Sequence, residues 1–471
     1  MQYYSIIGLE VHLELNTKSK VFCGCSTEFG NAPNSQTCPV CLGMPGSLPV
    51  LNKQALLLAL RVGIALSCAI SDFTKFDRKN YFYPDLAKNY QISQYDKPLS
   101  YGGFLDVEVK RIGIRRVHLE EDTGKLLHKE GENYSLIDFN RSGIPLLEIV
   151  SEPDINSPQE AYEYLTQLKA ILEYLDVSDC DMEKGSLRCD ANISVSLDPK
   201  KLGVKAEIKN MNSFKAVRLA LEYESKRQVK AQEEGRKIIQ ETRLWDDAKG
   251  ITAPMRSKEE AHDYRYFPEP DLVPYVLDEK QIKEVKNSLP QLPQERKKKL
   301  ISEYALSAYD ANVLTQDKAL ADYFEGCAKI YDRPKAIANW LLSDIAAIMN
   351  ERQIGIRQLN LAPDNLVSML KMIDNNMISG KLAKDILLQM INTGKPAEKI
   401  VEENGLRQIS DDKALTEAAK EVLKENPKAV SDFKSGKNEA LVFLVGQLMK
   451  ATNGKANPVM ANKILKERLQ A

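Results

Sequence analysis

The 471-residue sequence has almost no net charge and no long, uninterrupted apolar run. Its 65 lysines and arginines nearly cancel its 66 aspartates and glutamates, which argues against a wholly basic nucleic-acid coat protein but not against a local basic face. The longest apolar stretch, residues 55–70, carries Arg61 and is expected to be a core helix rather than a membrane span. No signal or transit peptide is expected from the first ten residues. We therefore expect a cytoplasmic protein of several domains.

Several common enzyme motifs are absent as well. No G-x-x-x-x-G-K-[ST] loop and no G-x-G-x-x-G motif occurs, which excludes P-loop and Rossmann nucleotide sites. No G-x-S-x-G elbow occurs, and no cysteine stands in surroundings typical of a nucleophile, so hydrolase or glutaminase activity is not expected. Eight cysteines without a secretory signal argue against a disulfide framework.

The composition changes near residues 288–293, which read S-L-P-Q-L-P. Before this point, period-two strand patterns such as residues 6–15 alternate with helical patterns such as 158–174, and the latter begins with a Ser157-Pro158 cap. Beyond it the sequence is helical almost throughout. We predict an α+β fold with a mixed-sheet catalytic domain over residues 1–290, an all-α helical domain over 291–400 and a small helical tail module over 401–471.

Two close pairs of cysteines form the sharpest local motif: Cys23 and Cys25, then Cys38 and Cys41. Four thiolates suit a closed tetrahedral zinc site with Zn–S distances of about 2.3 Å, which would be structural. The first pair is more tightly spaced than usual, and four free thiols are the alternative. The spacing favours zinc.

Residues 6–15 predict a strand with Glu10, His12 and Glu14 on one face and leucines and a valine on the other. One interpretation is an amphipathic strand with a solvated face. The other is a functional face, because a histidine flanked by carboxylates suits a divalent cation or a general base.

Charged clusters also stand in loop-like contexts around Lys79, residues 118–125, 140–148, 185–192 and 207–210. They supply the carboxylates that magnesium prefers and the cations that phosphoryl transfer needs. Each cluster taken singly is more often a solvated salt-bridge loop. The tail carries a basic set against one acidic residue, Glu467, and a merely solvated cationic face is its plainer interpretation. This basic set consists of Lys450, Lys455, Lys463, Lys466 and Arg468.

These segments together resemble the B subunit of aspartyl/glutamyl-tRNA amidotransferases along essentially the whole chain. The matching motifs are GLEVHLEL (8–15), the cysteine insert with PGSLPVLN (45–52), KFDRKNYFYPDLAKNYQISQY (75–95), HLEEDTGK (118–125), DFNRSGIPLLEIVSEPD (138–154), GSLRCDANIS (185–194), AEIKNMNSF (206–214), DYRYFPEPDLVP (263–274) and FLVGQLMKATNGKANP (443–458).

The resemblance implies a cradle-like first domain and an ATP-dependent reaction within a heterotrimer. The B subunit phosphorylates the side-chain carboxylate of Glu-tRNA(Gln) or Asp-tRNA(Asn), and ammonia from a glutaminase A subunit then forms the amide, while a small C subunit stabilises the pair. By motif match, the Mg²⁺ and ATP site falls on Glu10, His12, Glu121, Glu148 and Asp190. Lys79, Arg188 and Lys209 are implied as contacts for phosphate or the substrate carboxylate, although Arg188 and Lys209 equally suit structural ion pairs. The resemblance also implies that the last two domains bind the tRNA and that the basic set of the tail contacts its phosphates.

Two rival hypotheses remain. A non-catalytic RNA-binding scaffold would use the cysteine motif and the basic tail, and would leave His12 on a plain surface. An ATP-grasp-like ligase is disfavoured, because the sequence lacks glycine-rich loops that would cover phosphates.

Overall fold

The computed structural model describes residues 2–107, 110–128, 131–255, 264–404, 412–437, 439–452, 456 and 458–470. The chain divides into two compact units, Met1–Glu295 and Arg296–Ala471. A mixed sheet with covering helices in the first unit and helices in the second confirm the predicted α+β class. Within the described residues, no helix is both long and apolar enough to cross a membrane.

The first unit is built on a large sheet with the order β14-β13-β12-β11-β1-β10-β7-β6-β2. Neighbouring strands are antiparallel except β12 and β13, which are parallel. Its strands are β1 (Tyr4–Glu14), β2 (Ala69–Ile70), β6 (Ser100–Asp106), β7 (Arg111–Glu121), β10 (Pro145–Ser151), β11 (Leu187–Ser196), β12 (Ala206–Lys209), β13 (Glu241–Asp246) and β14 (Ile251–Pro254).

Small sheets accompany it. They are β15-β4-β5, β16-β3 and β8-β9, formed by β3 (Phe73–Thr74), β4 (Asp77–Asn80), β5 (Tyr90–Ser93), β8 (Lys125–His128), β9 (Ser135–Asp138), β15 (Phe267–Pro268) and β16 (Tyr275–Val276). The helices of this unit are α1 (Lys53–Ala65), α2 (Pro158–Tyr174), α3 (Phe214–Glu233) and α4 (Glu279–Asn287).

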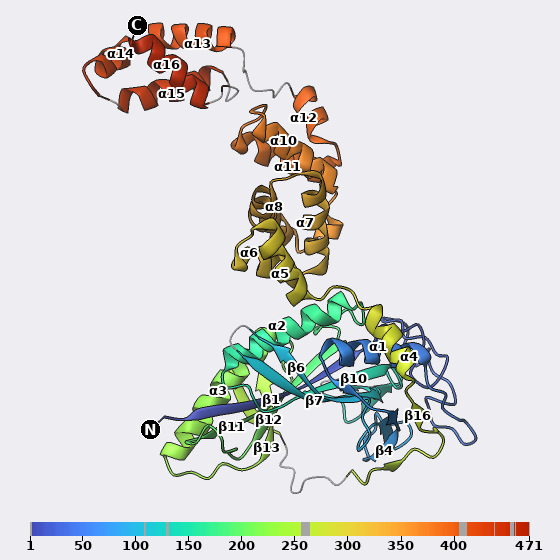
Figure 1. Cartoon of the computed structure of the whole chain (residues 1–471). Helices are drawn as coiled ribbons and strands as arrows, with labels where there is room; N and C mark the ends of the chain where they lie inside the picture. The colour runs from blue at the N-terminus through green and yellow to red at the C-terminus, as the bar shows by residue number, and fades with distance from the viewer. Residues whose placement is uncertain are drawn as a thin grey trace. The chain divides into compact units, whose positions relative to one another are not determined.

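One face of the large sheet is apolar and lies under helices α1, α2 and α3 (Figure 1). Leu9, Val11 and Leu13 of β1 are at most 1% exposed and belong to this core. The predicted cap of α2 is confirmed, because Ser157 Oγ accepts the amide N–H of Glu160 at 3.1 Å. Since side chains alternate along a strand, Glu10 and His12 of β1 point to the opposite, polar face.

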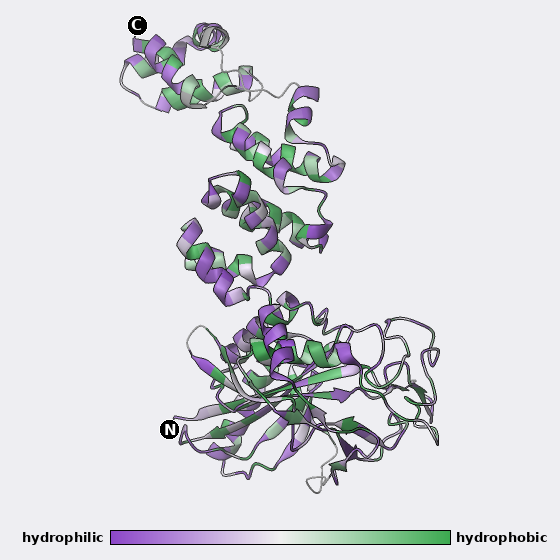
Figure 2. Ribbon diagram, turned by 45° about the vertical axis from the view of Figure 1, so that its right-hand side comes forward, coloured by the Kyte–Doolittle hydropathy of each residue, from purple (hydrophilic) through white to green (hydrophobic). Residues whose placement is uncertain are grey.

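The second unit has two apolar clusters, one in residues 300–401 and one in residues 415–469. Figure 2 shows apolar and hydrophilic residues alternating along its helices, as amphipathic packing requires. Its elements are α5 (Pro293–Tyr304), α6 (Ala308–Gln316), α7 (Lys318–Ile330), α8 (Pro334–Trp340), the π-helix η1 (Leu341–Ile345), α9 (Ala346–Arg352), the 3₁₀ helix η2 (Ile356–Gln358), α10 (Pro363–Asp374), α11 (Gly380–Thr393), α12 (Ala397–Glu403), α13 (Asp412–Glu425), α14 (Pro427–Lys434), α15 (Glu439–Ala451) and α16 (Pro458–Gln470).

Candidate functional site

The polar face of the large sheet brings charged residues from four adjacent strands into one row. Arg188 of β11 lies opposite His12 of β1, which lies opposite Glu148 of β10, which lies opposite His118 of β7. Directly opposed side chains in antiparallel strands are neighbours on the same face. The register of three strand pairs therefore creates a site that no single segment contains.

His12, His118, Glu120 and Glu148 form the centre of this face and are called here the acid–histidine cluster. Glu148 Oε2 lies 3.1 Å from His118 Nε2 and 3.6 Å from His12 Nε2, and Glu120 Oε2 lies 3.7 Å from His118 Nε2. The hydroxyl of Ser93 donates to Glu120 Oε2 at 3.0 Å. One ligand atom each from His12, Glu120 and Glu148 lies within 4.8 Å of the others. This spacing and donor set fit a divalent cation.

The cluster is strongly charged although it is buried. Burial alone would raise the pKa of Glu148, but His118 and His12 outweigh it and hold that pKa well below its ordinary value. Burial likewise opposes a charge on His118, yet Glu148 and Glu120 raise its pKa to about 9. The two histidines therefore favour the ionised form of Glu148, and His118 and Lys79 do the same for Glu120.

Glu121, which the family motif implied as a metal ligand, lies on the other face of β7. Its carboxylate is 2.5 Å from Lys88 Nζ and accepts the amide N–H of Ile92 at 2.8 Å. The structure places Glu120 in the cluster instead, because Glu120 and His118 are two residues apart and share a face. Period-two alternation from His118 was the signal in the sequence that would have indicated Glu120.

Glu10 and Asp190 lie opposite each other on the polar face, one step along the strands from His12. Glu10 Oε1 accepts a hydrogen bond from Asn192 Nδ2 at 3.0 Å. Burial, together with the negative charges of Glu148 and other carboxylates, raises the pKa of Glu10. Both residues adjoin the cluster, but neither belongs to the group whose ligand atoms lie within 4.8 Å.

The three predicted phosphate contacts differ in their partners. Arg188 Nη2 is 2.6 Å from Asp122 Oδ2, and Lys209 pairs with Asp190, so both take part in ion pairs. No carboxylate among the described residues lies within 4.0 Å of Lys79 Nζ, although its side chain is close enough to Glu120 and Glu148 for their charges to raise its pKa against the effect of burial. Lys79 therefore differs from Arg188 and Lys209 in having no ion-pair partner among the described residues.

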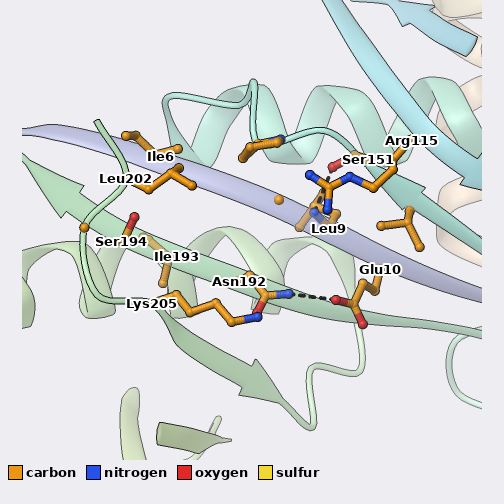
Figure 3. A pocket seen from close by; sticks show the side chains of 14 residues that line it. Ile6, Leu9, Glu10, Arg115, Ser151, Asn192, Ile193, Ser194, Leu202 and Lys205 are labelled. Atoms are coloured by element: carbon orange, nitrogen blue, oxygen red, sulfur yellow. Dashed lines mark hydrogen bonds between the residues drawn. The ribbon is translucent and has the colours of Figure 1, made fainter. Parts of the chain in front are cut away.

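A cavity of about 280 Å³ extends the polar face beyond Glu10 (Figure 3). Its lining combines apolar surface from Ile6 and Leu202 with polar side chains, and Figure 3 shows Asn192 between Lys205 and Glu10. Lys205 Nζ donates to Asn192 Oδ1 at 3.0 Å. Sequence reasoning did not single out this cavity, because its walls come from β1, β7, β10, β11 and loops that are distant in the chain.

The four predicted cysteines converge. Sγ atoms of Cys23, Cys25, Cys38 and Cys41 all lie within 4.8 Å of one another. Lys20 is fully buried beside them, with its Nζ 3.8 Å from Cys41 Sγ and 3.2 Å from the carbonyl oxygen of Phe139. A hydrogen bond from Cys23, with a further contribution from Lys20, lowers the pKa of Cys41 to about 4. A thiolate set with a buried counter-charge fits a structural zinc ion.

The basic set of the tail lies on the last two helices where the structure describes it. Lys450 of α15 and Lys463, Lys466 and Arg468 of α16 are exposed. Lys455 lies outside the described residues.

Comparison with known proteins places both units in one family. Residues 5–283 match the GatB/GatE catalytic domain, and residues 322–469 match the GatB domain. The chain is 57% identical to the B subunit of the aspartyl/glutamyl-tRNA(Asn/Gln) amidotransferase of Thermoanaerobacter sp. (strain X514), over the full length of both chains. The B subunits of the same amidotransferase from Carboxydothermus hydrogenoformans and Thermodesulfovibrio yellowstonii are 54% and 53% identical, over at least 99% of each chain.

Proposed function

Because this chain belongs to the family of B subunits of aspartyl/glutamyl-tRNA(Asn/Gln) amidotransferases, we propose that it activates and amidates the amino acid carried by a mischarged tRNA. Its substrate is Glu-tRNA(Gln), Asp-tRNA(Asn) or both. It works in a heterotrimer with a glutaminase A subunit that supplies ammonia and with a small C subunit. The observation that carries the proposal is the buried acid–histidine cluster beside Lys79, within the domain that matches the catalytic domain of the family.

The chemistry follows from the poor electrophilicity of a carboxylate. A side-chain carboxylate oxygen of the substrate attacks the γ-phosphorus of ATP, the bond to the β–γ bridging oxygen breaks, and ADP leaves. Ammonia then attacks the carbonyl carbon of the acyl phosphate, inorganic phosphate leaves, and the nitrogen loses one proton. Lys79 stabilises the negative charge that gathers on the transferred phosphoryl group.

His12, Glu120 and Glu148 are the residues that would hold magnesium, with Glu10 beside them. Bound magnesium supplies charge neutralisation for the phosphates. The two ionised carboxylates provide the hard oxygen donors that this ion prefers. His118 orients Glu120 and Glu148 through its contacts at 3.7 and 3.1 Å.

The cavity beside Glu10 suits the nucleoside part of ATP. It joins the polar face at Glu10, and its apolar wall of Ile6, Leu9 and Leu202 can cover a base. Lys205 adds positive charge at its edge. A ligand held there can extend along the polar face of β1 to the acid–histidine cluster.

The cysteines form a structural zinc site in this proposal, and Lys20 neutralises part of its charge. Four thiolates around Zn²⁺ carry a net charge of about −2, which burial makes costly. No carboxylate among the described residues lies within 4.0 Å of Lys20, so the cysteine site is its negative partner.

Lys20→Met should therefore weaken zinc binding by about 10- to 100-fold, the usual cost of losing an outer-shell partner. Competition with a chromophoric zinc chelator measures this affinity on the purified chain. Lys18→Met is the matched control, because Lys18 is exposed on the same segment. Equal zinc affinity for the Lys20→Met and Lys18→Met variants would remove Lys20 from the site.

The basic set of the tail contacts the phosphate backbone of the tRNA in this proposal. Exposed lysines and arginines on helices supply affinity that falls with salt and depends little on sequence.

The test of the proposed function is amide formation by the chain assembled with its partner subunits. The assay supplies Glu-tRNA(Gln) or Asp-tRNA(Asn) with ATP, magnesium and ammonium chloride, which bypasses the glutaminase. Glu10→Gln should reduce turnover by about 10²-fold or more, because a carboxylate beside the residues that would hold magnesium is lost, while tRNA affinity stays unchanged.

Omission of ATP is the control and should abolish the product. A folded wild-type complex that binds tRNA but forms no amide with either substrate would contradict the proposal and favour the RNA-binding scaffold. Full turnover by the Glu10→Gln variant would exclude Glu10 from the reaction.

A further inference from the structure

Two segments with similar aromatic sequences lie side by side next to the acid–histidine cluster. They are residues 80–85, NYFYPD, and residues 264–271, YRYFPEPD. Strand β15 pairs with β4, and Asn80 binds the second segment twice, through its amide N–H to the carbonyl of Tyr264 and through Nδ2 to that of Arg265, both at 2.8 Å. The pairing gathers aromatic rings around Lys79.

These rings form a continuous series, called here the aromatic wall, which consists of Tyr81, Tyr264, Tyr266 and Tyr95. Ring centroids of Tyr81 and Tyr264 are 5.8 Å apart, and those of Tyr264 and Tyr266 are 6.1 Å apart. Tyr266 and Tyr95 are stacked, with centroids 4.3 Å apart and planes inclined by 11°. Lys79 Nζ lies 4.9 Å from the ring centroid of Tyr264.

The wall runs from the acid–histidine cluster to the surface. Lys79 lies against the ring of Tyr264 in the middle of the series, and the charges of Lys79, Glu120 and Glu148 all affect the pKa of the next ring, Tyr266. At its outer end, Tyr95 is 53% exposed although Tyr266 covers one face of its ring. Tyr95 is also close to the cluster along the chain. Ser93, whose hydroxyl donates to Glu120, is two residues before it, so the Cα atoms of Ser93 and Tyr95 are at most about 7 Å apart.

The two aromatic segments also carry exposed rings of the kind that bind single-stranded nucleic acid. Phe82 and Tyr83 of the first segment are 73% and 56% exposed, and the guanidinium carbon of Arg265 lies 5.6 Å from the ring centroid of Phe82. Aromatic side chains that serve only as core are covered, whereas these are open and accompanied by cations. Exposed rings with nearby arginine or lysine bind unpaired bases by stacking and phosphates by charge.

We propose that the open face of Tyr95 stacks on the unpaired 3′-terminal base of the substrate tRNA. The stack anchors the end of the RNA at the mouth of the site, and the esterified amino acid extends along the aromatic wall toward Lys79 and the acid–histidine cluster. This inference rests on the proposed function, because it names the place where the substrate of that reaction is held. Tyr95 is a binding residue here and takes no part in the bond changes.

The test uses a tRNA that carries 2-aminopurine in place of its 3′-terminal adenine, because stacking quenches the fluorescence of this base. The wild-type chain with its partner subunits should quench it on binding. Tyr95→Leu, which keeps an apolar side chain without a ring, should lose most of the quenching and raise KM for the aminoacyl-tRNA by about 5- to 100-fold. KM for ATP should not change. Tyr95→Phe should retain both properties.

Tyr134→Leu is the control, since Tyr134 is 48% exposed in the same unit. The stacking proposal would be overturned if the Tyr95→Leu variant turned over substrate with the same quenching and the same KM for aminoacyl-tRNA as the wild type. Absence of turnover in a wild-type complex that still quenches through Tyr95 would overturn the proposed function and leave the stack supported. The two failures are thus distinguishable.

Discussion

Glu120→Gln is expected to lower ammonium-dependent amide formation by about 10²- to 10³-fold, whereas Glu121→Gln is expected to leave turnover per folded complex unchanged. The two residues are neighbours in sequence, but only Glu120 faces His118, Glu148 and the cluster. Replacing its carboxylate with an amide removes one negative charge and one hard oxygen donor while keeping the shape of the side chain. Initial rates with the assembled complex measure the effect.

Glu121→Gln serves as the control and has a different expected effect. It leaves the buried Lys88 without its anionic partner, which should lower the free energy of unfolding by about 3–5 kcal/mol. Thermal unfolding followed by circular dichroism measures this loss. The opposite ranking of the two turnover numbers would restore Glu121 as the ligand that the family motif implied.

Lys79→Met is expected to lower kcat by about 10²-fold, with little change in tRNA affinity. Burial disfavours the charge of Lys79, yet Glu120 and Glu148 raise its pKa, so the ammonium is charged throughout the neutral range. Methionine keeps the apolar stem among the tyrosines and deletes only the cation. Single-turnover formation of ADP in the presence of mischarged tRNA isolates the phosphorylation step.

The matched control is Lys75→Met on the segment before β4. Its Nζ is held by Asp77 at 2.5 Å and Asp96 at 2.7 Å, so it is committed to ion pairs and should not affect the rate. Lys79→Arg should recover part of the kcat lost in Lys79→Met, because it restores the positive charge. Equal rates for Lys79→Met and wild type would show that another cation stabilises the transferred phosphoryl group.

Local patterning determined the individual elements and one face of the site. Alternation along residues 6–15 was enough to place Glu10 and His12 together on the polar face of β1, and proline after Ser157 was enough to begin α2. The close spacing of the four cysteines predicted their convergence, since short loops leave few other arrangements. Motif resemblance added the family, which the comparisons confirm over the full chain.

Tertiary structure alone decided which polar residues meet. Strand order and register bring His12 next to Glu148 and His118, which lie more than a hundred residues further along the chain. Both the order and the register depend on pairing between distant parts of the chain. The same pairing commits Arg188 to Asp122 and brings the two aromatic segments around Lys79. Period-two alternation in the sequence of a strand determines which side chains share a face. Which strands become neighbours is determined by the packing of the whole sheet.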